Sequence, residues 1–130
     1  GKSTFAREWL ITFPNSLIVS ADDHFMVDGI YKFDRSALGA AHKECFNKFV
    51  NASLSLDAII VDNTNTSPGE VQMYIDAAEE RGWWWSVLYF HCDVETSFVR
   101  NTHNVPKETI KRMQENLSKD VSFPMIRMPE

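Results

Sequence analysis

The first four residues, Gly1-Lys2-Ser3-Thr4, form the closing half of a phosphate-binding loop, whose full pattern is G-x-x-x-x-G-K-[ST]. Backbone N–H groups of such a loop surround the phosphates of a nucleotide. Its Lys meets the β- and γ-phosphates, and its Ser or Thr hydroxyl binds Mg²⁺. We therefore expect Gly1, Lys2, Ser3 and Thr4 to bind a nucleotide. The alternative is an ordinary helix N-terminus with a Ser cap.

Two adjacent carboxylates, Asp22 and Asp23, follow a short apolar run at residues 17–19. If that run is a strand of an open α/β sheet, both acids lie beyond its carboxyl end, where such sheets bind ligands. They could supply the general base that phosphoryl transfer to a hydroxyl requires. A helix cap or a solvated loop charge fits the spacing equally well.

A polar segment at residues 62–66, Asp-Asn-Thr-Asn-Thr, follows a second apolar run at residues 58–61. An acid after such a strand can hold Mg²⁺ through water, as the usual partner of a phosphate-binding loop. Asp62 is the first candidate, and Asn63 and Asn65 are further ones. The same residue types also favour turns, which is the alternative interpretation.

Arg100 begins the segment 100–106, which joins two expected helices. An Arg in this position could neutralise the charge that develops on a transferred phosphoryl group. The alternative is a surface Arg at a helix C-terminus, where it interacts favourably with the helix dipole and has no catalytic role.

Strands alternate with helices along the chain, which predicts an α/β fold with a parallel sheet and helices on both faces. The expected helices cover residues 4–13, 36–54, 67–81, 95–100 and 106–117, and the expected strands cover residues 17–19, 58–61 and 84–91. We expect residues 22–34 to be a loop over the site. We expect Trp83-Trp84-Trp85 to lie in the core and at its rim rather than to stack on bases.

Composition is that of an ordinary folded domain, so we expect residues 1–130 to form one domain. The net charge of −5 argues against general binding to nucleic acid, although a local basic funnel around one strand end is compatible with it. Two cysteines without paired spacing suit a cytoplasmic setting. No apolar run is long enough for a membrane span, and the His and Cys residues lack zinc-ligand spacing.

Taken together, these blocks resemble the P-loop kinase-like domain family, which includes phage-type polynucleotide 5′-kinase and the related AAA-domain ATP-binding proteins. The blocks that carry the resemblance are residues 1–8, 20–23, 61–66 and 99–106, with Ile110 and Met113. The resemblance covers residues 1 to about 117. It implies a parallel five-stranded P-loop core that binds ATP with Mg²⁺ as cofactor.

Carried over by position, the resemblance assigns Lys2 to the β- and γ-phosphates, Ser3 to the metal and Thr4 to a phosphate oxygen. Asp22 stands where the family has its general base, which would take the proton from a 5′-hydroxyl. Arg100 stands where the family has the lid arginine that stabilises the transferring phosphoryl group. Lys2, Asp22 and Arg100 are thus the expected catalytic residues.

Two positions depart from the phage-type kinases. Asn63 stands where those kinases carry an Asp, and we favour Asp62 as the metal-linked acid because Asn cannot ionise. His24-Phe25-Met26 stands where the phage kinase has an Arg that helps to hold the nucleic acid. Residues 28–34 look more like the AAA-domain relatives.

The sequence therefore predicts an ATP-dependent kinase that phosphorylates a hydroxyl, with the 5′-end of a nucleic acid as the first choice of acceptor. The alternatives are a small-molecule kinase for a nucleoside, sugar or antibiotic, and a non-catalytic nucleotide-binding module of a larger protein. The front half of the loop and the strand that feeds it would precede Gly1. We therefore expect the 130 residues alone to bind ATP poorly and to be inactive.

Overall fold

The computed structural model describes residues 1–63, 68–90, 106–117 and 124–128. They belong to two compact units, Gly1–Asn63 and Thr64–Glu130, and each unit is described by itself. That residues 1–130 form one domain stays a prediction. Within the described ranges, no helix combines the length and apolar character needed to cross a membrane.

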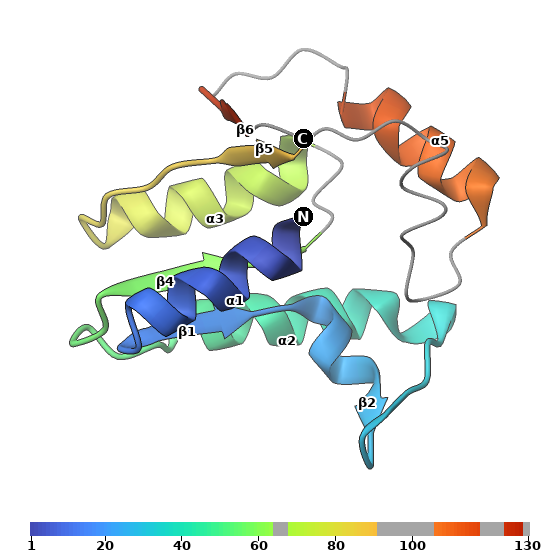
Figure 1. The fold of residues 1–130 in the computed structure, drawn as a ribbon, viewed down its shortest axis with the longest axis horizontal. Helices are drawn as coiled ribbons and strands as arrows, with labels where there is room; N and C mark the ends of the chain where they lie inside the picture. Colours follow the sequence, from blue (N-terminus) through green and yellow to red (C-terminus); the bar gives the residue numbers. More distant parts are fainter. Residues whose placement is uncertain (64–67, 91–105, 118–123, 129–130) are drawn as a thin grey trace. The chain divides into compact units, whose positions relative to one another are not determined.

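The first unit is built on a pair of parallel strands. Its elements are α1 (Lys2–Thr12), β1 (Ser16–Val19), η1 (Ala21–Phe25), β2 (Met26–Val27), β3 (Ile30–Tyr31), η2 (Arg35–Ala37), α2 (Leu38–Val50) and β4 (Ala58–Val61). β1 pairs with β4 in parallel, from Ser16 opposite Ala58 to Val19 opposite Val61. Both α1 and α2 contact β1, and in Figure 1 α1 lies in front of the strand pair and α2 behind it. This arrangement confirms the predicted α/β class.

The core of this unit follows from the apolar spacing of α2. Ala41, Cys45 and Phe49 recur every four residues, so they share one helix face, and all three are buried. The helix that we expected over residues 36–54 has the right buried face but begins with the 3-10 turn η2 and ends at Val50. The residues of β4 are all half-buried.

The prediction that residues 22–34 form a loop is wrong in part, because the segment holds a 3-10 helix and a β-hairpin. β2 and β3 pair antiparallel across the two-residue turn Asp28-Gly29. Both turn residues have positive φ angles, 51° and 79°, as a type I′ turn requires. The N–H of Lys32 donates to the carbonyl of Phe25 at 2.8 Å and ties the hairpin to η1. The Asp-Gly pair was the available signal.

The second unit contains α3 (Pro68–Glu80), β5 (Leu88–Phe90), α5 (Lys107–Leu117) and β6 (Ile126–Met128). The helices predicted at 67–81 and 106–117 are confirmed to within one residue at each end. The predicted strand 84–91 is shorter than expected, and it pairs in parallel with β6, which the sequence analysis missed. The helix expected over residues 95–100 lies outside the described residues.

The tryptophan run precedes β5 and does not belong to a strand. Our expectation that Trp84 packs in the core or its rim is wrong, because its side chain is fully exposed. Trp83 lies under the guanidinium of Arg81, 5.7 Å from the ring centre, and the indole N–H of Trp85 donates to Glu79 Oε1 at 3.3 Å. Polar groups at the end of α3 and directly after it thus contact two of the three rings.

Candidate nucleotide-binding site

The beginning of α1 has the character of an anion site. Gly1 is the N-cap, and its carbonyl accepts the N–H of Phe5 at 2.9 Å. The N–H groups of the first turn have no partner inside a helix, and the helix dipole adds partial positive charge there. No acid lies in this first turn, and the exposed Lys2 adds a full positive charge. Such a helix start suits a phosphate group.

The hydroxyl of Ser3 donates to Asp62 Oδ2 at 2.7 Å, which joins two segments 59 residues apart in sequence. The parallel strands explain this meeting. The N–H of Asp62 donates to the carbonyl of Val19 at 2.9 Å, so the β1–β4 ladder continues one residue past β4. Asp62 is therefore held by its backbone at the carboxyl edge of the strand pair, opposite the start of α1.

Asp22 is held at the same edge, in the first turn of η1. Its N–H donates to Ser20 Oγ at 3.2 Å, which caps this 3-10 helix. The N–H of the neighbouring Ala21 donates to Asn63 Oδ1 at 2.7 Å. One of these contacts comes from the end of β1 and the other from the end of β4. The two strand ends together fix the backbone that carries Asp22.

Asn63 points into the unit rather than toward Ser3. It is buried, and besides accepting from Ala21 it donates from Nδ2 to Cys45 Sγ at 3.4 Å. Its amide oxygen and nitrogen therefore serve η1 and α2, while Asp62 contacts Ser3. The choice of Asp62 over Asn63 as the acid at the metal stays a prediction.

Tyr31 is a residue near the site that the sequence analysis passed over. Its hydroxyl donates to Asp22 Oδ1 at 3.2 Å. Burial raises the pKa of Tyr31 to about 12, assisted by the negative charge of Asp22 and by this hydrogen bond. No motif marks Tyr31, because the contact depends on the hairpin that was expected to be a loop.

His24 is tied to α2 through the side chain of Glu44. Its Nδ1 lies 2.7 Å from Glu44 Oε2, and Glu44 Oε1 lies 3.4 Å from Lys48 Nζ. The hydrogen bonds from His24 and then Lys48 hold the pKa of Glu44 below its usual value. Asp23, the second acid of the predicted pair, is exposed.

The oxygen atoms of Ser3 and Asp62 suit Mg²⁺, which prefers oxygen ligands and takes few from the protein when phosphates and waters supply the rest. The residues described contain no group of three or more His, Cys, Asp or Glu side chains that could hold a metal ion. Arg100 and Asn65, two further candidates, lie outside the described residues.

Comparison with known proteins agrees with this geometry. The sequence model of the AAA domain matches residues 1–119. The human NEDD4-binding protein 2 is 35% identical over 139 residues, an alignment that includes 97% of this chain. The chain spans only 7% of the length of that relative. Since the family model matches most of the chain, the protein belongs to the AAA-domain family of P-loop, nucleotide-binding domains.

Proposed function

We propose that this domain transfers the γ-phosphoryl group of MgATP to a hydroxyl group. The observation that carries the proposal is the hydrogen bond of 2.7 Å from Ser3 Oγ to Asp62 Oδ2. It joins a P-loop hydroxyl to a carboxylate at the carboxyl edge of the parallel strands. That edge also bears Asp22, whose backbone the strand ends hold.

Each side chain in this arrangement has a chemical part. The start of α1, with Gly1 to Thr4, would bind the phosphates, and Lys2 would neutralise part of their charge. Ser3 and Asp62 would hold Mg²⁺, directly or through water. When bound, the ion supplies positive charge next to the phosphate oxygens. Arg100 stays a predicted lid residue.

Asp22 would act as the general base. As the oxygen of the acceptor forms its bond to the γ-phosphorus, the bond between that phosphorus and the β–γ bridging oxygen breaks. The proton of the acceptor hydroxyl passes to the Asp22 carboxylate, and ADP leaves with the bridging oxygen. A positioned base contributes about 10²–10⁴-fold to such a reaction.

A 5′-hydroxyl end of a nucleic acid is the acceptor that we propose. The support is the resemblance of the ordered blocks to phage-type polynucleotide kinase, with Asp22 at the position of its base. A single strand end requires only a local site, so the overall charge of −5 does not count against it.

The test is transfer of label from γ-labelled ATP to a 5′-OH oligonucleotide by the protein with its complete G-x-x-x-x-G-K-[ST] loop. We expect Asp22→Asn to lower the rate about 100-fold or more while MgATP affinity, measured by calorimetry, is unchanged. Asp57→Asn is the matched control, because Asp57 is exposed and precedes β4 at the opposite end from Asp62.

Three outcomes would count against parts of the proposal. Label that reaches nucleosides or sugars but not oligonucleotides would refute the acceptor and keep the reaction. Full activity in Asp22→Asn would refute the base. MgATP binding without transfer to any hydroxyl would refute the kinase activity and favour a nucleotide-binding module.

A further inference from the structure

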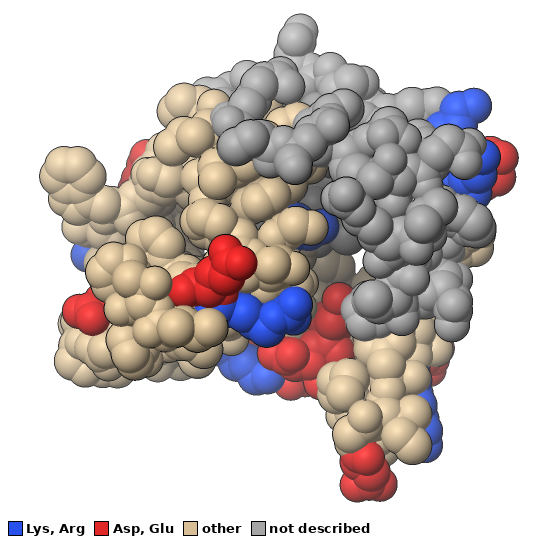
Figure 2. All heavy atoms as spheres, in the orientation of Figure 1, with Lys and Arg blue, Asp and Glu red and all other residues tan. Residues whose placement is uncertain are grey.

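The hairpin β2–β3 is a protrusion with exposed apolar side chains, and it also contacts the carboxylate of Asp22. Met26, Val27 and Ile30 are exposed along it, and Figure 2 shows the protrusion mostly in tan, with acidic atoms at its tip and basic atoms along one side. Its inner residue, Tyr31, is half-buried and donates to Asp22 Oδ1 at 3.2 Å. The hairpin thus brings the Tyr31 hydroxyl to the carboxylate of Asp22, which lies nine residues earlier in the sequence.

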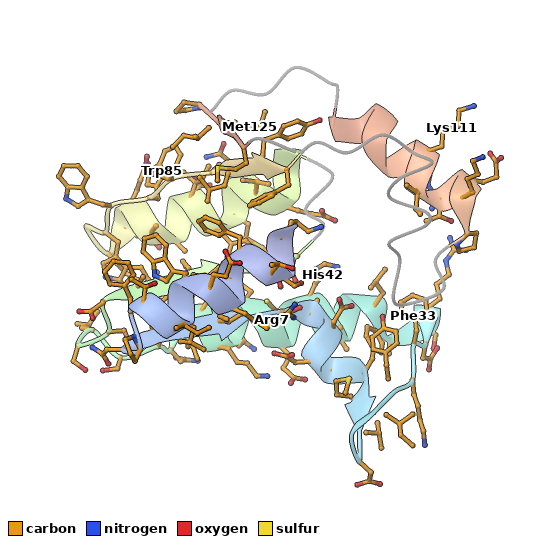
Figure 3. All side chains as sticks on the ribbon, in the orientation of Figure 1. Arg7, Phe33, His42, Trp85, Lys111 and Met125 are labelled. Carbon is orange, nitrogen blue, oxygen red and sulfur yellow. The ribbon has the colours of Figure 1, made fainter. Side chains whose placement is uncertain are left out.

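Four contacts of the hairpin and its flanking residues hold the ring that carries this hydroxyl. Tyr31 pairs with Met26 across the hairpin, and the next residue, Lys32, donates its N–H to Phe25. The Tyr31 ring meets the ring of the buried Phe25 edge-on, with 6.1 Å between ring centres. Phe33, labelled in Figure 3, contacts the same Phe25 ring at 5.1 Å. The Tyr31 hydroxyl is therefore placed by backbone pairing and aromatic packing.

We propose that Tyr31 is a positioning residue for Asp22: its hydroxyl fixes the rotation of the carboxylate that receives the acceptor proton. This proposal rests on the kinase function proposed above. The strand ends hold the backbone of Asp22, and the Tyr31 hydroxyl contacts one oxygen of its carboxylate. A donor on Oδ1 selects one orientation, and misplacement of a catalytic group by small distances lowers rates strongly.

The hydrogen bond from Tyr31 to Asp22 is long. At 3.2 Å it exceeds the usual range of about 2.5–3.0 Å for an O–H···O hydrogen bond, and bonds at catalytic groups are often long before substrate binds and shorten in the reacting complex. The hairpin that carries Tyr31 also borders the site, so a substrate that moves the hairpin would move the hydroxyl against Asp22. Tyr31 does not touch the reacting atoms, and its effect on the rate passes through Asp22.

The test is a double-mutant cycle with Tyr31→Phe and Asp22→Asn in the protein with the complete loop, assayed on a 5′-OH oligonucleotide. Tyr31→Phe keeps the ring and its packing on Phe25. We expect it to lower kcat about 10-fold and to leave the KM for ATP unchanged. In the Asp22→Asn background the same change should have almost no effect, because the carboxylate that it positions is absent. Tyr89→Phe, which removes a hydroxyl from β5 in the other unit, is the control.

A second measurement does not need activity. The ionisation of Tyr31, followed by tyrosinate absorbance as a difference from Tyr31→Phe, should be centred near pH 12 in the parent and shift to lower pH in Asp22→Asn. An unshifted Tyr31 ionisation would overturn the contact. Equal rate losses from Tyr31→Phe in both backgrounds would overturn the positioning role alone. A parent that transfers no phosphate would overturn the proposed function, and this role with it.

Discussion

Replacing Asn63 by Ala removes the acceptor for a buried backbone N–H and should destabilise the start of η1. The Asn63 side chain is 9% exposed, and its Oδ1 accepts the Ala21 N–H at 2.7 Å. Alanine has no side-chain oxygen that could replace this acceptor. A buried donor without a partner costs about 1–3 kcal/mol, and the weak contact from Nδ2 to Cys45 Sγ is lost as well. We expect a loss of about 2 kcal/mol, a large fraction of the ~5–15 kcal/mol typical of a folded domain.

Amide hydrogen exchange, measured residue by residue by NMR, tests the loss of this contact at the Ala21 N–H. The Ala21 N–H should exchange much faster in Asn63→Ala, because its protection depends on closed contact with Oδ1. Asn51→Ala is the matched control, since Asn51 is exposed at the end of α2 and its replacement should change stability by no more than about 0.5 kcal/mol. Unchanged Ala21 exchange in Asn63→Ala would refute the assignment of Asn63 as the acceptor, and with it the argument that β4 holds η1.

Other variants test the remaining contacts. Asp62→Asn should weaken MgATP binding about 10–100-fold, measured by calorimetry. Adding Asn63→Asp should not restore the affinity, because position 63 faces Ala21 and Cys45, and restored binding would contradict this geometry. Glu44→Gln should lower stability by less than about 1 kcal/mol, since the pair is at the surface. The pKa of Glu44 is lowered in the folded state, so the stability difference between the parent and Glu44→Gln should be present above pH 4.5, the ordinary pKa of Glu, and vanish as the pH falls through the folded pKa. Urea titrations at a series of pH values measure this difference, and a difference that persists in acid would contradict the assigned contact. Gly29→Ala should speed exchange of the Lys32 N–H, because φ is +79° at position 29 and alanine is strained there. Unchanged exchange would show that the turn tolerates alanine.

The sequence predicted the parts of the fold that depend on local pattern. The apolar runs of β1 and β4 and the four-residue spacing of α2 each report burial through neighbouring residues alone. The meeting of Ser3 with Asp62 was also predictable. Once both apolar runs are taken as parallel neighbours, their carboxyl ends coincide, and the phosphate-binding motif heads the helix that covers them.

The missed features depend on contacts between segments whose partners carry no pattern. β6 is only three residues long, too short for a periodic pattern, and it pairs in parallel with β5. Trp84 is large and apolar, so burial was the natural expectation. It is nevertheless exposed, while Trp83 and Trp85 on either side of it are half-buried.

Asn63 and Tyr31 lie near the carboxyl edge of the strand pair, where each contacts a neighbouring residue rather than the ligand that we propose. Asp62 and Asn63 are adjacent in sequence, yet the first contacts the P-loop hydroxyl and the second the backbone beneath Asp22. Consecutive side chains leave an extended backbone on opposite sides, so a strand end with two polar residues can serve a ligand and the core at once. Tyr31 adds a third contact from the hairpin, on the side-chain oxygen of Asp22. The Asp22 backbone is thus held by the strand ends and one oxygen of its carboxylate by the hairpin, so a change in the hairpin can alter the proposed base without disturbing the start of α1.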